Sequence, residues 1–504
     1  MRLRSAGVTA ALVLACVAVG CSSGDDGAEE VSSTTMTTTM TTREEGPAAA
    51  FGGPLEGGAG VFLAASGPGP ALDDAGYAEA EYTAAGTATS YTSAGSLPAD
   101  GTFELEPGDE AAYMTRVVVR RPDDPAAFNG TVVVEWLNVS GGVDAPAEYT
   151  YLADELLRGG YAWVGASAQR IGVEGGPVAV EVPGAAGAGL GRGLRAQDPD
   201  RYGDLHHPGD AFSYDIFTQV ARALRSPGEV DPLDGLAVER VLAVGESQSA
   251  YALTTYVNGV QPLTGAFDGF LVHSRGGAAA PLGEPNAGID IASTIGGEPT
   301  TIRSDIETPV ILVETETDVL GILGYLPARQ PDGDRLRLWE VAGTAHADKF
   351  QVGAAEDALG CAQPINRGQQ AYVLRAALRH LDRWVRDGTA PPEAPRLEVD
   401  VAGPVPAFVL DDVGNVTGGI RTPAVDAPVD VLSGMPVEDA SIICLLMGRT
   451  TPLDADRLGE LWGSRDEYLN AYETATEEMI DAGFALPEDR EALLDEADPA
   501  RLPA

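Results

Sequence analysis

The sequence predicts an α/β fold with a mostly parallel central sheet flanked by helices. Two observations lead to this prediction. Short apolar runs of the kind that form buried strands alternate with helical patterns along most of the chain. The chain has 504 residues, of which 44% are hydrophobic and 21% charged, so it can bury one large core and a smaller appendage.

The predicted elements follow one another in the order expected for such a sheet. Runs at 77–92 and 111–120 indicate early strands joined by Gly-, Ser- and Pro-rich turns. The later strands are expected at 131–137, 161–166, 238–244, 269–273, 310–314 and 336–340, and helices at 149–158, 210–224, 366–386 and about 465–482. Parallel sheets bind ligands beyond the carboxyl ends of their strands, so the loops after the later strands are expected to share one rim.

The most informative stretch runs from Val238 to Tyr256, where an apolar strand breaks at Gly245, presents Ser247 and resumes as a helix. A serine hydroxyl is a poor nucleophile until a base removes its proton, so it must stand exposed on a sharp turn near that base. Ser249 stands where the Gly-x-Ser-x-Gly pattern has its second glycine, and the close strand–helix approach needs only a small side chain there. The stretch therefore predicts a nucleophile elbow with Ser247 as the nucleophile.

His346 is the expected general base. It follows the last predicted strand by a short glycine-containing loop, and the chain order of this architecture is serine, acid, histidine. The competitor is His273, which ends a strand on the same rim but would violate that order. The chain has 5 histidines in all.

The acid that orients the base should lie just beyond the strand that starts at Pro309. Asp318 fits best, because it lies in the turn after the strand. Glu316 is the alternative, and Glu314 is expected to be still on the strand.

Two backbone N–H groups are needed to stabilise the oxyanion of acyl transfer. One is expected from Gln248, the residue after the nucleophile, and the other from the loop after the 131–137 strand, at Val139 or Ser140. A plain glycine turn at 138–142 is the alternative interpretation of that loop.

Seven segments carry a resemblance to a known family. They are Val134–Gly142, Gly165–Gln169, His207–Asp210, Gly245–Ser249, Glu316–Asp318, Gly343–His346 and Gly414–Pro423. Together they resemble an α/β-hydrolase family of bacterial proteins, over the chain from about residue 52 to the end. The resemblance implies the α/β-hydrolase fold, a triad of Ser247, Asp318 and His346, and ester cleavage, but it defines no single substrate.

The N-terminus predicts export. Arg2 and Arg4 precede an apolar stretch that is too short to span a bilayer, and Gly20-Cys21 follows directly. This resembles a bacterial lipoprotein signal in which Cys21 becomes the lipidated first residue. Ala18 stands where that pattern usually has leucine, so plain secretory cleavage remains the alternative. We expect a cell-membrane lipoprotein that faces the extracytoplasmic side.

The chain is expected to divide into four parts. These are a signal peptide (1–20), a Thr/Ser/acidic tether (21–50), the catalytic α/β-hydrolase domain (51–395) and an appendage packed on the core (396–504). Residues 274–306 lie where such folds often insert a lid, and 172–209 form a second long loop on the same rim.

Cys361 and Cys444 are the only cysteines left once Cys16 has been cleaved off and Cys21 lipidated. In an oxidising compartment we expect a disulfide between them, with two buried free thiols as the alternative.

Charge and composition limit the classes of binding partner that the sequence allows. With 76 acidic against 32 basic residues the net charge is −44, so we do not expect the folded body to bind nucleic acid or anionic membrane surfaces. The expected partners are a small-molecule or lipid-like ester and, through the N-terminal lipid only, the membrane; the oligomeric state is unknown. No Cys/His cluster has metal-ligand spacing, so neither a metal nor a cofactor is implied.

The sequence thus predicts an envelope-anchored serine carboxylester hydrolase that works through an acyl-enzyme. Two alternatives stay open: an acyltransferase that uses the same triad on an envelope acceptor, and a non-catalytic binding lipoprotein that retains the fold.

Overall fold

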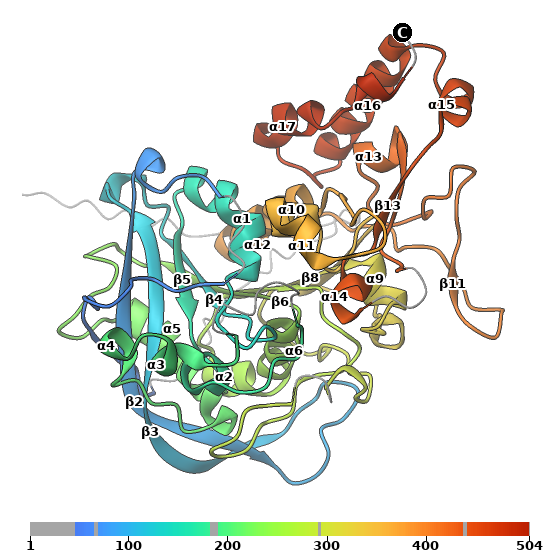
Figure 1. Ribbon diagram of the computed structural model, residues 1–504. Coiled ribbons are helices and arrows are strands. Elements are labelled where there is room, and N and C mark those ends of the chain that lie inside the picture. Colours follow the sequence, from blue (N-terminus) through green and yellow to red (C-terminus); the bar gives the residue numbers. More distant parts are fainter. Residues whose placement is uncertain (1–45, 65–68, 182–189, 291–293, 437–440, 503–504) are drawn as a thin grey trace, which may run out of the picture. The chain divides into compact units, whose positions relative to one another are not determined.

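A nine-stranded sheet organises the residues that the computed structural model describes, 46–504 without 65–68, 182–189, 291–293, 437–440 and 503–504 (Figure 1). The strand order is β1-β2-β3-β5-β4-β6-β7-β8-β9, antiparallel as far as β5 and parallel from β5 to β9. The strands are β1 (Ala50–Gly52), β2 (Tyr77–Ser93), β3 (Leu105–Pro122), β4 (Thr131–Trp136), β5 (Ala162–Ala166), β6 (Arg240–Glu246), β7 (Gly269–His273), β8 (Val310–Thr315) and β9 (Leu336–Val341). The predicted fold class is confirmed.

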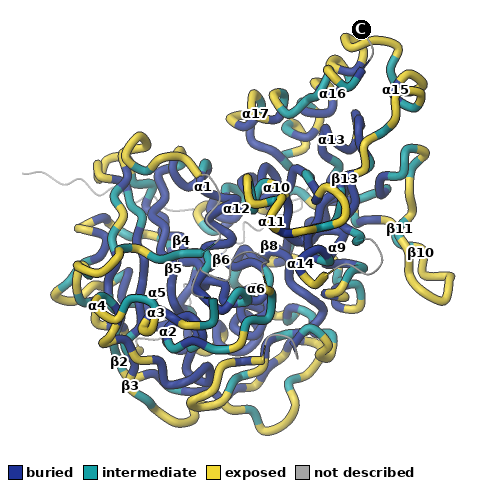
Figure 2. The backbone as a smooth tube through the Cα atoms, in the orientation of Figure 1, coloured by how far each residue is buried: buried dark blue, intermediate teal, exposed yellow. Residues whose placement is uncertain are grey.

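Helices cover both faces of this sheet because its central strands are apolar on both sides. Val132 and Val134 pack toward α5 and α6, whereas Val133 packs toward α1 and α12. Figure 2 shows the strands as a continuous buried centre. The covering helices are α1 (Ala147–Arg158), α5 (Ser213–Arg225), α6 (Gln248–Thr255) and α12 (Gln370–Asp387).

The first hairpin departs from the sequence prediction. β3 begins at Leu105 rather than at 111, and it pairs with β2 along nearly its whole length. The added residues include exposed Glu106 and Glu110, so this part of the strand lacks the apolar alternation that identifies a strand in sequence.

The described parts of segments 172–209 and 274–306 carry little regular structure. The first contains short helices that the sequence did not predict, α3 (Gly193–Gln197) and α4 (Pro199–Tyr202), after α2 (Arg170–Glu174). The second is fixed by Arg275, a fully buried residue whose guanidinium donates to the carbonyl oxygens of Gly276, Gly277, Ala278 and Thr300.

Four further short helices lie along the chain. They are α7 (Gln261–Thr264) and α9 (Glu316–Leu320) before His346, and α10 (Lys349–Val352) and α11 (Glu356–Leu359) after it.

Residues beyond 395 pack against the carboxyl edge of the sheet. Ile420 pairs with Val341 of β9, and the N–H of Ala342 donates to Ile420 O. All described residues belong to one compact unit, Arg43–Ala504, and the division at residue 395 stays a prediction. The elements here are β10 (Val399–Asp400), β11 (Ala407–Phe408), α13 (Pro423–Asp426), β12 (Asp430–Ser433), α14 (Ile442–Leu446), β13 (Arg449–Pro452), α15 (Ala455–Leu461), α16 (Arg465–Asp481) and α17 (Arg490–Asp495).

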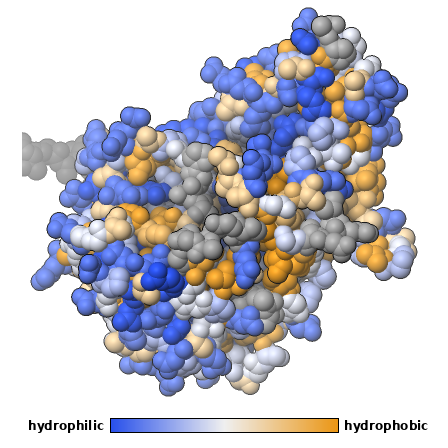
Figure 3. Space-filling model, in the orientation of Figure 1, coloured by the Kyte–Doolittle hydropathy of each residue, from blue (hydrophilic) through white to orange (hydrophobic). Residues whose placement is uncertain are grey.

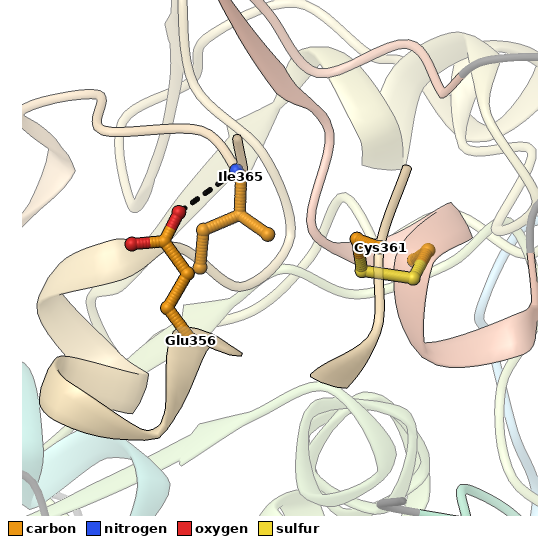
Figure 4. Close-up of a disulfide and its surroundings, with 4 residues drawn as sticks. Glu356, Cys361 and Ile365 are labelled. Carbon is orange, nitrogen blue, oxygen red and sulfur yellow. Dashed lines mark hydrogen bonds between the residues drawn. A yellow bond between two sulfur atoms is a disulfide. The ribbon is translucent and has the colours of Figure 1, made fainter. Parts of the chain in front are cut away.

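A disulfide joins the segment after His346 to this C-terminal region (Figure 4). Cys361 and Cys444 have Cα atoms 5.6 Å apart and are separated by 83 residues in sequence. Beside the bond, the Ile365 N–H donates to Glu356 Oε1.

Hydrophilic side chains cover much of the face shown in Figure 3, as the net charge of −44 requires. Among the described helices, none combines the length and the apolar character that a bilayer span needs. Cys21, the expected signal peptide and most of the tether lie outside the described residues.

Candidate active site

Ser247 lies on a strained turn between β6 and α6. Its backbone has φ 62° and ψ −120°, a left-handed conformation that non-glycine residues rarely adopt. The Ser247 N–H donates to His273 O at 3.0 Å, and the Tyr251 N–H donates to Ser247 O at 3.2 Å. The turn lifts the Ser247 side chain above the carboxyl end of the sheet, where it is partly exposed.

Two small residues allow the strand and the helix to approach at this turn. A Cβ on Gly245 would lie 2.9 Å from Ser249 Cβ and 3.0 Å from Leu253 Cδ1, so position 245 requires glycine. Ser249 is fully buried at the position of the pattern's second glycine. The arrangement explains why serine replaces glycine there without preventing the turn.

Ser247, His346 and Asp318 form one hydrogen-bonded chain. His346 Nε2 lies 2.8 Å from Ser247 Oγ, and His346 Nδ1 lies 2.8 Å from Asp318 Oδ1. The imidazole is 3% exposed and Asp318 is fully buried. The three residues come from the loops after β6, β9 and β8, so the fold brings together distant parts of the sequence.

The second oxygen of Asp318 is held by three donors. Asp318 Oδ2 accepts from Ser274 Oγ and from the N–H and hydroxyl of Thr315, each at 2.7 Å. Burial raises the pKa of Asp318, but the hydrogen bond and charge of His346 and the Thr315 donors outweigh it, so that its pKa is lowered from 3.8. Asp318 is therefore an ionised carboxylate whose orientation is fixed.

Glu316, the alternative acid, faces elsewhere. Its Oε1 accepts from Gly343 N–H at 2.6 Å and its Oε2 from Gly434 N–H at 2.8 Å. Burial raises the pKa of Glu316 to about 7 against these two donors. Glu316 thus joins the acid loop to the loop of His346 and to the C-terminal region. Glu314 lies on β8, as predicted.

His273, the alternative base, lies beneath the site. Its Nδ1 is 2.9 Å from Glu148 Oε2 and its Nε2 is 3.4 Å from Gln370 Oε1. Burial lowers the pKa of His273, but Glu148 outweighs it and raises that pKa to about 9. His273 reaches the nucleophile only through its backbone carbonyl.

Of the three expected oxyanion donors, two already have acceptors. Gln248 N–H is the first of α6, where a helix offers no acceptor of its own. The Val139 N–H donates to Gln248 Oε1 at 3.2 Å, and the Ser140 N–H donates to Asn138 Oδ1 at 2.8 Å. Asn138 Nδ2 in turn donates to Glu246 O at 3.0 Å, which ties this loop to the elbow.

Sequence reasoning missed several partners of these residues. The Thr315-x-x-Asp318 spacing is a capping box, a pattern that could have identified Thr315 as a partner of Asp318. Ser274, Gly434 and Asn138 carry no such local signal, because only the tertiary fold places them beside their partners. No group of three or more His, Cys, Asp or Glu side chains among the described residues could hold a metal ion.

A family model described as an alpha/beta hydrolase domain matches residues 51–495. The chain therefore belongs to this α/β-hydrolase family, and the resemblance seen in the sequence is confirmed. No curated protein matches the chain.

Solved structures with similar folds include three hydrolases. An esterase from Rhizomucor miehei is 10% identical with a TM-score of 0.32, covering 64% of this chain and 88% of its own. A lidless α/β serine hydrolase from Xanthomonas campestris is 13% identical with a TM-score of 0.30, covering 60% and 94%. A serine hydrolase homologue from Coxiella burnetii is 11% identical with a TM-score of 0.26, covering 45% and 82%. Similarities at this level carry no argument about the reaction.

Proposed function

We propose that this protein is a serine hydrolase that cleaves carboxylic esters through an acyl-enzyme. One observation carries the proposal: the chain Ser247 Oγ, His346 Nε2, His346 Nδ1, Asp318 Oδ1, with both contacts at 2.8 Å. Such a chain activates a hydroxyl that is otherwise unreactive.

In the first half of the proposed reaction, His346 Nε2 takes the proton of Ser247 Oγ as the oxygen attacks the ester carbonyl. Asp318 accepts a hydrogen bond from the Nδ1–H of the imidazole, without taking the proton, and stabilises the imidazolium that forms. Protonated His346 then gives its proton to the leaving alcohol, and an ester bond to Ser247 replaces the substrate's ester bond.

In the second half, His346 takes a proton from water as the water oxygen attacks the acyl-enzyme carbonyl, and it returns that proton to Ser247 Oγ as the acid leaves. Both tetrahedral intermediates carry an oxyanion, for which Gln248 N–H supplies one donor. The Val139–Ser140 loop supplies a second through the Ser140 N–H once it leaves Asn138 Oδ1, because the Val139 N–H is held by Gln248 Oε1. Membership of the α/β-hydrolase family supports the reaction class, while acyl length and alcohol stay undefined.

The test is a set of triad variants on an ester panel of varied acyl length. Ser247→Ala and His346→Ala should each lower kcat by several orders of magnitude, and the double variant should lose little more, because the two residues act as a unit. Asp318→Asn should lower kcat roughly a thousandfold or more. Near-normal turnover in Ser247→Ala would exclude the serine mechanism.

A fluorophosphonate probe gives an independent readout. It should label Ser247 in the wild-type protein and not in Ser247→Ala, with circular dichroism showing that both are folded. Absence of labelling in folded wild-type protein would favour a non-catalytic binding role instead.

We further propose that the enzyme acts at the cell envelope, held by a lipid on Cys21. The support is the sequence alone: the short apolar stretch, Gly20-Cys21 and the polar tether that follows.

A further inference from the structure

Two of the family-like segments, Gly165–Gln169 and His207–Asp210, have no part in the triad, yet both reach the elbow through buried side-chain amides. Gln248 Nε2 donates to Gln169 Oε1 at 2.5 Å, and Gln169 Nε2 lies 3.5 Å from Asp210 Oδ2. At the other end, the Val139 N–H donates to Gln248 Oε1 at 3.2 Å. Gln169 and Asp210 are fully buried and Gln248 is 4% exposed.

The donors and acceptors allow only one orientation of these amides. The Trp136 indole N–H can only donate, and it donates to Gln169 Oε1 at 3.0 Å. Gln169 Nε2 must therefore face Asp210, and Gln169 Oε1 is left to accept from Gln248 Nε2. That leaves Gln248 Oε1 facing the Val139 N–H, so the chain of bonds has a fixed direction from Val139 to Asp210.

Asp210 anchors this chain of bonds. Its Oδ1 accepts from the Arg170 N–H at 2.7 Å and from Ser213 Oγ at 3.1 Å, and its Oδ2 accepts from the Ile289 N–H at 2.7 Å. Ile289 belongs to the 274–306 insertion. The bonds thus connect the insertion, the start of α2 and the loop after β4.

We propose that Gln169 and Gln248 act through their side chains as positioning residues for the oxyanion hole. This inference rests on the proposed function. Backbone bonds hold the ends of the 138–142 loop, where Asn138 pairs with Ala145 and the Gly142 N–H donates to Val139 O, but the Val139 and Ser140 N–H groups bond only to side chains. Gln248 Oε1 holds the loop on one side, and Asn138 Nδ2 holds it on Glu246 O on the other. An oxyanion donor is effective only within a few tenths of an ångström of its ideal place.

The test is Gln169→Glu, which preserves shape and both acceptor contacts but replaces the Nε2 donor by an oxygen that faces Asp210. The repulsion should displace the chain of bonds. We expect kcat to fall by about 10- to 100-fold at pH 8 with KM within about threefold, because oxyanion contacts strengthen in the transition state. The affinity of phenylboronic acid, which forms a tetrahedral adduct with the serine, should fall in parallel with kcat.

The pH profile separates positioning from a general structural role. As pH falls, the introduced carboxyl group protonates and can again donate to Asp210. The deficit of Gln169→Glu relative to wild type at the same pH should therefore narrow from pH 8 to pH 5. A constant deficit across that range would overturn the inference.

Gln261→Glu is the matched control. Gln261 is also buried, and its Nε2 donates to Phe267 O at 2.7 Å and to Thr308 Oγ1 at 3.0 Å, away from the triad. The Gln261→Glu variant should lose stability as Gln169→Glu does, but it should keep the wild-type kcat and boronate affinity. An equal loss of both in this control would show that the effect is general and overturn the inference.

Should Gln169→Glu fail to fold, Gln248→Met tests the other end of the chain, since it keeps side-chain volume and removes both bonds. It should show the same parallel loss of kcat and boronate affinity without pH-dependent recovery. If the wild-type enzyme is active and either folded variant keeps wild-type kcat and boronate affinity, the positioning role is overturned while the proposed function stands. A wild-type protein that neither cleaves esters nor binds the boronate overturns the proposed function itself.

Discussion

At the scale of single residues, the acid loop shows how two neighbouring carboxylates take different roles. Asp318 and Glu316 are both fully buried, but Asp318 faces His346 whereas Glu316 receives only backbone N–H groups. Their pKa values move in opposite directions, down for Asp318 and up to about 7 for Glu316. Environment, rather than residue type, separates the charged partner of the base from a structural side chain.

Glu316→Gln should therefore spare catalysis and lower stability. The new amide keeps one acceptor oxygen but presents an NH₂ group to the second backbone donor, which costs about 1–3 kcal/mol. Ester turnover should stay within about tenfold of wild type, in contrast to Asp318→Asn. Urea denaturation measures the loss of stability, and steady-state kinetics measures ester turnover. A thousandfold loss of kcat in Glu316→Gln with normal turnover in Asp318→Asn would show that Glu316, and not Asp318, is the acid of the triad.

The sequence was sufficient to identify the residues that the structure brings together. Ser247, Asp318 and His346 could be chosen because each follows a strand whose end is recognisable. What could not be predicted is which polar groups complete their surroundings. Ser274 contacts Asp318 only because β7 and β8 are neighbours, and Gly434 contacts Glu316 across more than a hundred residues.

At the scale of elements, strands that are buried on both faces were the easiest to predict, and partly exposed ones the hardest. β4 and β8 consist of buried residues throughout, so composition alone indicates them. β3 begins six residues before its predicted start, because its first part is solvated and is held by pairing with β2. The short helices α3 and α4 were missed, since each is too short to show a helical period.

The disulfide fixes the segment that follows the base. Removing it with Cys361→Ser and Cys444→Ser should lower the free energy of unfolding by roughly 4 kcal/mol, the chain-entropy value for a loop of this size. Cys444 belongs to the same apolar cluster as Ala347, the neighbour of His346, but His346 keeps its own side-chain bonds to Ser247 and Asp318, so turnover at 25 °C should change little. Thermal unfolding of the double variant measures the loss. Two titratable thiols in unreduced, unfolded mature protein, which has lost Cys16 and carries lipid on Cys21, would contradict the bond.

At the scale of the whole molecule, three buried groups whose pKa is raised on folding make stability fall as pH rises, whereas the lowered pKa values of His207 and His380 act in the opposite direction below about pH 6.5. Burial raises the pKa of Glu135 to about 8 and that of Glu246 to about 7, while Glu148 raises that of His273 to about 9. A group whose pKa is raised on folding binds its proton more tightly in the folded state, so its stabilising effect is lost as pH rises through the folded pKa.

The melting temperature should therefore be highest at mildly acidic pH and fall from about pH 5 to pH 9. The two carboxylates contribute to this loss of stability above their unfolded pKa of about 4.5, and His273 contributes to it above its unfolded pKa of about 6.5. Calorimetry across this range at constant ionic strength tests the expectation. Glu135→Gln cannot ionise, so it should flatten the decline between pH 5 and pH 8. A melting temperature that rises with pH would contradict the assignment.

Anchoring is a property of the whole chain. If Cys21 carries a lipid, full-length protein should fractionate with membranes, and Cys21→Ala should not mature normally. Fractionation of cells that express each form, with the esterase panel as the readout, measures this. Equal release of both forms into the soluble fraction would contradict lipidation.

The backbone conformation at Ser247 is unfavourable for folding but required for catalysis. Only glycine adopts a left-handed conformation without strain, yet glycine at this position would remove the nucleophile. Selection for folding and selection for chemistry therefore favour different residues at this one position. A homologue that no longer needs catalytic activity would gain stability from glycine at position 247. Glycine at this position therefore indicates a family member that has lost its catalytic activity.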